Sequence, residues 1–283
     1  MTLSDLPPLR ESLAAHGLLA RKSFGQHFLL DLNVTRKIAR LAGPLEGGAV
    51  IEVGPGPGGL TRALLEAGAR VIAIEKDERF RPLLEELAAS GGALTLVFAD
   101  ALKADEAALA REHAPGLPIR IVANLPYNVG TPLLIKWLSG PRVWEGMALM
   151  FQKEVARRVV ARAGEADYGR LSVISQALSR PSIVMDLPAR AFTPPPKVDS
   201  AVVRFEPLDA RPSPEIVTRL EQVTQAAFGQ RRKMLRSSLR RIGGEALLER
   251  AGLDPQLRAE DVPVEGFLRL AKQLGLPPLY GNG

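Results

Sequence analysis

The sequence predicts an α/β protein with a parallel sheet, followed by a small all-helical domain. Three observations support this: strand-like runs alternate with helix-like runs from residue 49 to residue 152, several strand-like runs are apolar throughout, and only helical spacing remains after residue 214. Such alternation is typical of a sheet covered by helices on both faces. Strands apolar on both faces are typical of the same architecture. Ligands are then expected beyond the carboxyl ends of the strands.

The expected strands are 49–53, 70–75, 94–98, 119–123, 147–152 and 201–207. The expected helices are 58–68, 78–90, 104–113, 131–139, 215–228, 231–241, 244–251 and 264–274. In the first of them, Leu60, Ala63 and Leu64 recur at helical spacing and Gly68 ends the run. The turn-rich segment 209–214 separates the two groups, so we predict one domain over 1–207 and a helical, basic domain over 208–283.

Composition narrows the possible chemistry. The chain has 283 residues, a net charge of +6 and no cysteine. The absence of cysteine excludes disulfides, thiolate nucleophiles and cysteine-ligated zinc, and we expect no metal site. No segment has the length or apolar character of a signal peptide or a membrane span, so we expect a soluble, cytoplasmic protein. The positive charge permits a polyanionic partner.

The first expected strand runs into a glycine-rich loop, "IEVGPGPGGLT". Gly54, Gly56 and Gly59 satisfy the dinucleotide pattern G-x-G-x-x-G. The loop also resembles a P-loop, but Leu60 stands where a phosphate-binding lysine is required, which excludes a nucleotide triphosphatase. NAD and S-adenosylmethionine remain as candidates. The pattern E-x-G-x-G-x-G that begins at Glu52 favours S-adenosylmethionine.

Two acids at the ends of the next strands predict contacts with an adenosine. Glu75 ends the second strand, and its carboxylate can accept hydrogen bonds from both ribose hydroxyls. Asp100 follows the third strand, and its carboxylate can accept a hydrogen bond from the adenine amine. Taken alone, Asp100 is more simply an N-cap of the following helix. Its register with Glu75 favours the ligand contact.

The fourth strand ends in "NLPY", which predicts the reaction. The amide oxygen of Asn124 and the carbonyl of Leu125 are acceptors, and Pro126 keeps Leu125 out of helical geometry. Tyr127 supplies a flat face for a base. Two acceptors on the exocyclic amine of adenine would localise its lone pair and stabilise the charge that develops during methyl transfer. No strong general base is needed.

Several ordered motifs resemble the KsgA-type ribosomal RNA adenine N6-dimethyltransferases along nearly the whole chain. They are "RKSFGQHFLLD", "EVGPGPGGLT", "IEKD", "NLPY", "FQKEVARRVVA", "YGRLSV", "FTPPPKVDSAV" and "FGQRRKMLR". The resemblance implies a class I, Rossmann-like methyltransferase sheet with a small helical C-terminal domain. It also implies S-adenosylmethionine as the cofactor and dimethylation of two adjacent adenosines near the 3′ end of 16S rRNA during small-subunit assembly.

By position, the resemblance implies that the cofactor is bound by Gln26, His27, Leu29, Gly54, Gly56, Glu75, Asp100 and Asn124. It implies that Phe192 stacks on the flipped adenine opposite Tyr127, although the sequence alone makes Phe192 a core residue. His27 stands where the commoner form of the motif has Asn. A ring nitrogen can still form a hydrogen bond there, but without the resemblance His27 reads as an ordinary surface histidine.

Two basic segments are candidates for binding RNA. "GQRRKMLRSSLRR" (229–241) carries six positive charges in 13 residues and an apolar stripe, which predicts a basic helix. A second basic helix follows the fifth strand. A solvated helix face is the simpler interpretation of one such run, whereas two favour RNA. The predicted RNA-binding residues are Lys153, Arg157, Arg158, Arg231, Arg232, Lys233 and Arg236.

Three other functions stay open at this point. A large-subunit rRNA adenine methyltransferase of the macrolide-resistance type shares the fold and a similar Asn-x-Pro-Tyr/Phe motif. A non-catalytic assembly factor could keep the fold, although the intact "NLPY" argues against loss of chemistry. An NAD dehydrogenase is the weakest alternative, because neither a second substrate domain nor a catalytic histidine is evident. No apolar surface stripe is left unassigned, so we expect a monomer.

Overall fold

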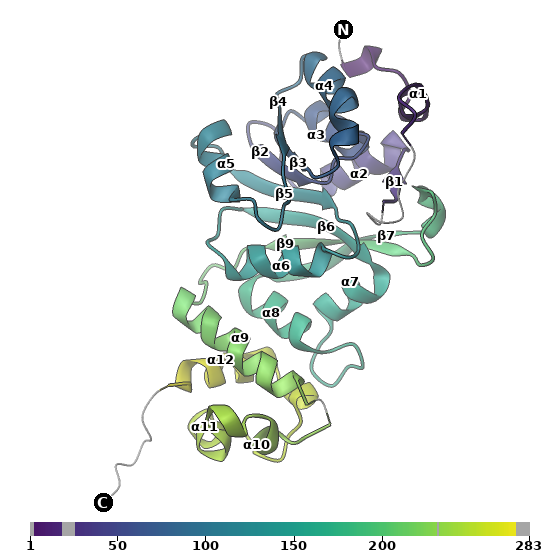
Figure 1. Ribbon diagram of the computed structural model, residues 1–283. Coiled ribbons are helices and arrows are strands. Elements are labelled where there is room, and N and C mark those ends of the chain that lie inside the picture. The colour runs from purple at the N-terminus through teal and green to yellow at the C-terminus, as the bar shows by residue number, and fades with distance from the viewer. Residues whose placement is uncertain (1–2, 19–25, 231, 276–283) are drawn as a thin grey trace, which may run out of the picture. The chain divides into compact units, whose positions relative to one another are not determined.

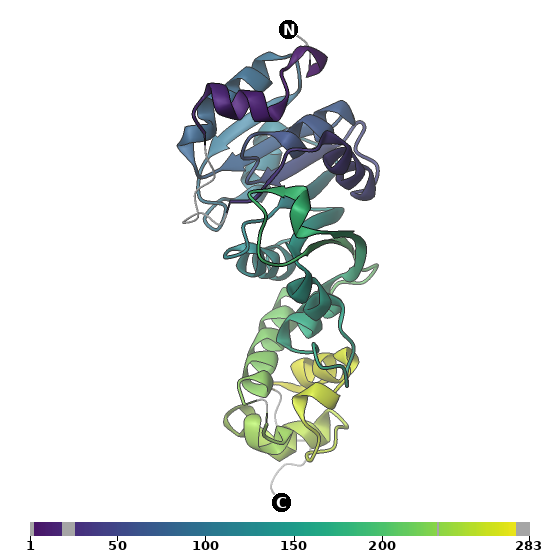
Figure 2. The same cartoon turned by 90° about the vertical axis from the view of Figure 1, so that its right-hand side faces the viewer.

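The computed structural model describes residues 3–18, 26–230 and 232–275. Its contacts divide the chain into two compact units (Figures 1 and 2). The first comprises the described residues up to Trp137 together with 141–156 and 182–206. The second comprises 138–140, 157–181 and the described residues from Pro207 onward. The division of labour between a catalytic domain 1–207 and an RNA-binding domain 208–283 stays a prediction.

The described strands are β1 Phe28–Leu29, β2 Ala49–Val53, β3 Arg70–Glu75, β4 Leu94–Phe98, β5 Ile119–Asn124, β6 Gly146–Gln152, β7 Arg180–Leu187, β8 Phe192–Thr193 and β9 Ser200–Glu206. The described α-helices are α1 Leu9–Ala15, α2 Leu32–Leu41, α3 Gly59–Glu66, α4 Arg81–Ala89, α5 Glu106–His113, α6 Gly130–Ser139, α7 Lys153–Val160, α8 Arg170–Leu178, α9 Pro214–Phe228, α10 Leu235–Ser238, α11 Gly244–Arg250 and α12 Val264–Gln273. None of these helices is long and apolar enough to cross a membrane.

A seven-stranded sheet in the order β4-β3-β2-β5-β6-β9-β7 organises the fold. The strands β2 to β6 pair in parallel, as the sequence predicts. β9 instead runs antiparallel to β6, with Met147 opposite Phe205. The sheet is therefore mixed rather than purely parallel.

Helices α2, α3 and α4 cover one face of this sheet and form its main core. Ile38 of α2, Leu64 of α3 and Leu84 of α4 are at most 2% exposed and belong to one apolar cluster with Val50 and Val122 of the sheet. Helices α5 and α6 lie on the other side (Figure 1). Covering both faces leaves the ends of the parallel strands as the accessible part of the sheet.

The second unit is built around α9 and α12. The ring of Phe228 on α9 stacks on that of Phe267 on α12, with 5.4 Å between centroids. Tyr168 meets the edge of Phe228, and its hydroxyl donates a 2.8 Å hydrogen bond to the carbonyl of Val262. Residues 157–181 thus pack with the C-terminal helices, although they precede the linker at 209–214.

The predicted helix over 231–241 is wrong. Within this range the described α-helix is α10, which spans only Leu235–Ser238. Met234 is extended, with φ −63° and ψ 152°, and forms an isolated β-bridge with Arg258. The Leu235 amide donates to the carbonyl of Leu257 at 2.8 Å. These contacts with a segment distant in sequence replace the hydrogen bonds of a continuous helix, which local spacing cannot reveal.

Candidate active site

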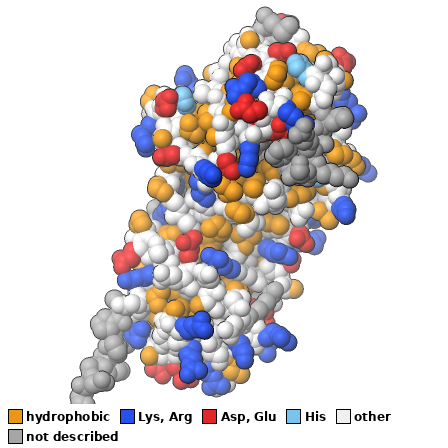
Figure 3. All heavy atoms as spheres, in the orientation of Figure 1, with side chains coloured by type: hydrophobic (Ala, Val, Ile, Leu, Met, Phe, Trp, Pro, Cys, Tyr) orange, Lys and Arg blue, Asp and Glu red, His pale blue; other side chains and the backbone are white. Residues whose placement is uncertain are grey.

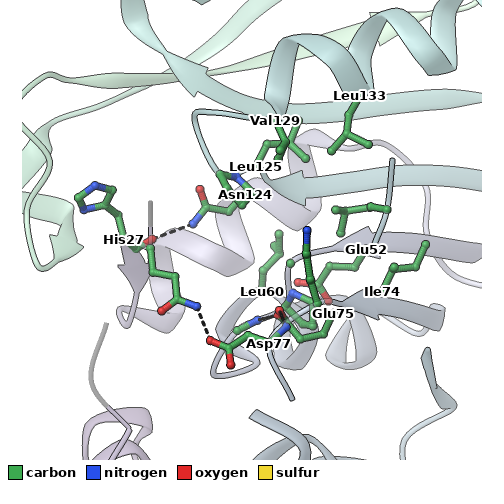
Figure 4. A pocket seen from close by; sticks show the side chains of 18 of the residues that line it. His27, Glu52, Leu60, Ile74, Glu75, Asp77, Asn124, Leu125, Val129 and Leu133 are labelled. Atoms are coloured by element: carbon green, nitrogen blue, oxygen red, sulfur yellow. Dashed lines mark hydrogen bonds between the residues drawn. The ribbon is translucent and has the colours of Figure 1, made fainter. Parts of the chain in front are cut away.

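A cavity of about 170 Å³ opens at the carboxyl ends of β2, β3, β4 and β5 in the first unit (Figure 4). A second hollow behind Leu125 and Tyr127 measures only about 10 Å³, which is room for a single water molecule. The larger cavity is lined by the glycine loop, the two acidic strand ends and the "NLPY" turn. The structure therefore brings together the glycine loop at 52–60, the strand ends at 74–77 and 99–102, and the turn at 124–129, which are separate in the sequence.

The glycine loop has the backbone that a closely approaching ligand requires. Gly54, Gly56 and Gly58 have φ of +71°, +52° and +81°, a region that residues with a Cβ rarely adopt. A Cβ at Gly56 would also lie 3.4 Å from the ring of Phe28, and one at Gly59 would lie 2.5 Å from the carbonyl oxygen of Leu29. The bare backbone of Gly54 and Gly56 faces the cavity.

Glu75 ends β3 as a buried, well-ordered acceptor. Its side chain is 7% exposed, and its carboxylate accepts hydrogen bonds from the amides of Gly56 at 3.0 Å and Asp77 at 2.8 Å. Burial raises the pKa of Glu75, and these amide hydrogen bonds oppose that rise. The carboxylate is thereby fixed beside the glycine loop, where its remaining lone pairs can accept ribose hydroxyls.

Asp100 lines the cavity just after β4 and forms no helix cap. Its Oδ1 accepts the amide of Leu102 at 3.0 Å, whereas α5 is capped by Asp105. Its Oδ2 pairs with the ammonium of Lys76 at 2.9 Å. The hydrogen bond from Lys76 holds the pKa of Asp100 below its usual range, so Asp100 is an ionised acceptor. A ligand amine would share Oδ2 with Lys76.

Asn124 is held by His27, the residue that departs from the commoner form of its motif. Its Nδ2 donates to the backbone carbonyl of His27 at 3.1 Å, which uses the donor end of the amide and leaves Oδ1 as the acceptor (Figure 4). In the turn that follows, the carbonyl of Pro126 accepts the amides of Val129 and Gly130, both at 3.1 Å. The first backbone acceptor of this turn is therefore the carbonyl of Pro126. Leu125 precedes that residue and lies outside the turn, as its position before proline predicts.

Tyr127 is held by a hydrogen bond at its hydroxyl and by a stacking contact on one face of its ring. Its hydroxyl is hydrogen-bonded to Ser200 at 2.8 Å, and burial raises its pKa. One face stacks on the ring of His27, with 5.5 Å between centroids and 29° between planes. The Nδ1 of His27 is in turn 2.8 Å from the carbonyl oxygen of Pro194. A base could stack only on the other face of Tyr127 while this arrangement persists.

Phe192 does not line the cavity. It is 3% exposed, lies in the apolar core cluster and pairs with Leu29 where β8 meets β1. This is the position that its residue type alone predicts. Its stacking on an adenine stays a prediction, which would require the side chain to leave the core.

Sequence reasoning missed several cavity residues next to those it named. Gln26 Nε2 donates to Asp77 at 2.9 Å, and Asp77 is bonded to Arg79. Lys76 also lines the cavity. Lys76 and Asp77 directly follow Glu75 at a strand end, so the strand-end rule already contained the signal for them. No group of His, Cys, Asp or Glu side chains in the described ranges could hold a metal ion.

The predicted RNA-binding residues differ in their availability. Arg157, Arg158, Arg232, Lys233 and Arg236 are exposed in the second unit. Figure 3 shows basic side chains gathered over the part of that unit that contains α10 and α11. Lys153 lies in the first unit, where it pairs with Asp186 at 3.1 Å. Arg231 lies outside the described residues.

The mixed seven-stranded sheet, with a glycine loop and two strand-end acids around one cavity, defines a class I methyltransferase. The residues fit S-adenosylmethionine: the loop offers bare backbone, Glu75 and Asp100 offer acceptors for an adenosine, and Glu52 keeps an unpartnered buried oxygen. The same cavity carries the "NLPY" acceptors at its rim.

Comparisons with known proteins agree. The family model described as ribosomal RNA adenine dimethylase matches residues 17–275. Ribosomal RNA small subunit methyltransferase A of Phenylobacterium zucineum (strain HLK1) is 69% identical over 96% of this chain and 94% of its own. The protein of that name from Caulobacter vibrioides (strain ATCC 19089 / CIP 103742 / CB 15) is 64% identical over 90% of this chain and 97% of its own.

Two solved structures are similar as well. The 23S rRNA methyltransferase ErmE has a TM-score of 0.63 and 30% identity, covering 88% of this chain and 100% of its own. A dimethyladenosine transferase from Plasmodium falciparum has a TM-score of 0.72 at 23% identity, covering 86% of this chain and 96% of its own, which supports the fold. The chain belongs to the ribosomal RNA adenine dimethylase family. It is an S-adenosylmethionine-dependent rRNA adenine N6,N6-dimethyltransferase.

Proposed function

We propose that this enzyme dimethylates the N6 amines of two adjacent adenosines near the 3′ end of 16S rRNA, in the small ribosomal subunit or its precursor. The observation that carries the reaction is the orientation of Asn124, whose Oδ1 is left as the acceptor by the hydrogen bond to His27. The choice of the small subunit is supported by the names of relatives 69% and 64% identical. We expect the enzyme to act in the cytoplasm, where it would encounter this RNA.

The bound cofactor supplies an electrophilic methyl group on a sulfonium. The chain's part is to hold the target amine against it. Oδ1 of Asn124 and the carbonyl of Leu125 would accept the two N6 hydrogens, which raises electron density on the nitrogen. Both interactions strengthen as positive charge develops on the amine, so they stabilise the transition state more than the ground state. Tyr127, fixed by Ser200, would support the base from its open face.

The decisive experiment is transfer of labelled methyl to unmethylated small and large ribosomal subunits, followed by nucleoside mass analysis. We expect dimethyladenosine in the small subunit alone. Label in the large subunit would favour the second candidate, a large-subunit enzyme, to which the 30% identity with ErmE points. Label in neither, with cofactor binding intact, would favour the non-catalytic assembly factor. Light scattering would test the expected monomer.

A further inference from the structure

Glu52 is a buried acid in the cavity wall that nothing described so far employs. It is the penultimate residue of β2, its side chain is 1% exposed, and it lines the cavity close to Glu75 and Ile74 (Figure 4). Its Oε2 has no hydrogen-bond partner among the described residues.

Glu75 shows what a satisfied acid in this cavity looks like. Its carboxylate receives two backbone amides, from Gly56 and Asp77, whereas the free oxygen of Glu52 receives none. A buried carboxylate without compensation gives up its charge by taking a proton. Burial raises the pKa of Glu52 to about 8, the nearby charge of Glu75 adds to the rise, and Thr61 opposes it. Near neutral pH, the ligand-free enzyme therefore holds Glu52 mainly as the acid.

The cavity does not provide Glu52 with a cation of its own. The other titratable groups of the cavity wall are His27, Glu75, Lys76, Asp77, Asp100 and Tyr127. Lys76 is an exposed side chain that pairs with Asp100, and Asp77 is paired with Arg79. Among the charges of the described residues, the one that acts on Glu52 is the negative charge of Glu75. A positive partner would have to come with the ligand.

We propose that Glu52 is the counter-charge for the ammonium group of the cofactor's methionine part and that it releases its proton when the cofactor binds. The O–H bond of the carboxylic acid breaks, the proton passes to solvent, and the ammonium takes its place as the electrostatic partner. No bond to carbon is made or broken. The inference rests on the proposed function and on the placement that the family resemblance implies, in which the methionine end of the cofactor lies at Gly54 and Gly56.

Proton release can be measured without turnover. Isothermal titration calorimetry at pH 7 in two buffers of different ionisation enthalpy gives the number of protons released. The ligands are S-adenosylmethionine, S-adenosylhomocysteine, which keeps the ammonium, and 5′-methylthioadenosine, which lacks the amino-acid part. We expect release of roughly one proton with the first two ligands and none with the third, because one acid changes its charge state.

The variant Glu52→Gln keeps the size of the side chain and removes the titration. We expect it to abolish the release, to weaken both charged ligands about tenfold or more and to leave 5′-methylthioadenosine unchanged. From pH 6 to pH 7.5, the wild-type dissociation constant for S-adenosylhomocysteine should fall by up to about tenfold per pH unit, and that of Glu52→Gln should stay flat. Glu85→Gln, an exposed glutamate on α4, is the matched control. Because imidazoles titrate in the same pH range, His27→Asn tests whether a histidine causes this pH dependence. We expect His27→Asn to keep the wild-type dependence of the dissociation constant on pH.

Equal release with 5′-methylthioadenosine, release with S-adenosylmethionine alone, or unchanged release in Glu52→Gln would each overturn the assignment. If Glu52→Gln does not fold, the comparison of the three ligands on the wild-type enzyme still decides. Asp100→Ala distinguishes a failure of the cofactor placement from a failure of the role of Glu52. If it leaves all three ligands bound as before, the placement of the cofactor fails; if it weakens all three, only the role of Glu52 is in question.

Discussion

At the scale of a single residue, Asn124 is the proposed catalytic residue, because the hydrogen bond from its Nδ2 to His27 leaves its Oδ1 as an oriented acceptor in the cavity wall. Replacing it with alanine removes that acceptor and leaves the backbone turn at Pro126 intact. We expect Asn124→Ala to lower kcat by about 10² to 10³, the range for losing one oriented transition-state partner. RNA affinity should be unchanged. Single-turnover methyl transfer and filter binding on the same RNA would measure the two quantities.

Asn33→Ala, on the exposed side of α2, is the matched control and should behave as wild type. A variant Asn124→Ala that transfers methyl at the normal rate would remove Asn124 from the mechanism. Equal loss of RNA binding and methyl transfer would instead indicate that Asn124 maintains the RNA-binding surface and does not position the target adenine amine.

His27 explains how this chain tolerates a departure from the commoner Asn of its motif. Its contact with Asn124 is made by the backbone carbonyl, which any residue supplies. Its ring has a separate task, since it stacks on Tyr127 and its Nδ1 lies 2.8 Å from the Pro194 carbonyl oxygen. The His27 side chain thus supports Tyr127, whereas the orientation of the Asn124 amide does not depend on that side chain.

At the scale of elements, Lys136 on α6 ties the helix after "NLPY" to the loop after β4. Its ammonium donates to the carbonyls of Ala101 at 2.8 Å and Ala104 at 2.6 Å, and to Glu106 at 2.8 Å. The same glutamate oxygen accepts the indole N–H of Trp137. Asp100 and Leu102 of this loop form one wall of the cavity. Lys136 therefore fixes the predicted adenine side of the site.

We expect Lys136→Met to raise the dissociation constant for S-adenosylmethionine several-fold, with kcat at saturating cofactor nearly unchanged. It should also lower the free energy of unfolding by about 1–3 kcal/mol, because Glu106 stays buried without its cation. Adding Glu106→Gln should restore part of that loss. Urea unfolding and calorimetric titration measure both effects. Lys103→Met, exposed on the same loop, is the control, and an equal effect there would argue against the contact.

Element by element, the buried parallel strands were predictable because burial on two faces leaves a plain apolar run. β2, β3 and β4 begin and end where the sequence predicts. β1 and β8 have two residues each, too few for any period, and β7 is a half-exposed edge strand with Pro181 as its second residue. The basic segment was mistaken for a helix because its pairing partner lies more than twenty residues further along.

The cavity was predictable to a similar extent and for a related reason. Glu75 and Asn124 end parallel strands of one sheet and Asp100 follows another, and the carboxyl ends of such strands meet at one edge. The partners that set their state were not predictable. Lys76 on Asp100 and the His27 ring on Tyr127 depend on side-chain geometry, and so does the lack of a partner at Glu52.

At the scale of the whole molecule, the candidate cofactor cavity and most of the predicted RNA contacts, all but Lys153 among the described ones, lie in different compact units. The cofactor cavity is lined wholly by residues of the first unit. Arg157, Arg158, Arg232, Lys233 and Arg236 belong to the second. Changing charge on the second unit should therefore alter RNA affinity without altering cofactor affinity.

We expect the charge reversal Arg231→Glu, Arg232→Glu, Arg236→Glu to weaken RNA binding and to flatten its dependence on salt. Each phosphate contact releases bound counterions, so each one lost should reduce the slope of log K against log salt by about 0.7 to 0.9. Binding at several salt concentrations gives this slope, and calorimetry with S-adenosylhomocysteine should show an unchanged dissociation constant. Arg10→Glu and Arg111→Glu, exposed in the first unit, form the control. The same slope in the reversed variant would place the RNA elsewhere, because removing charges from a true interface must release fewer counterions.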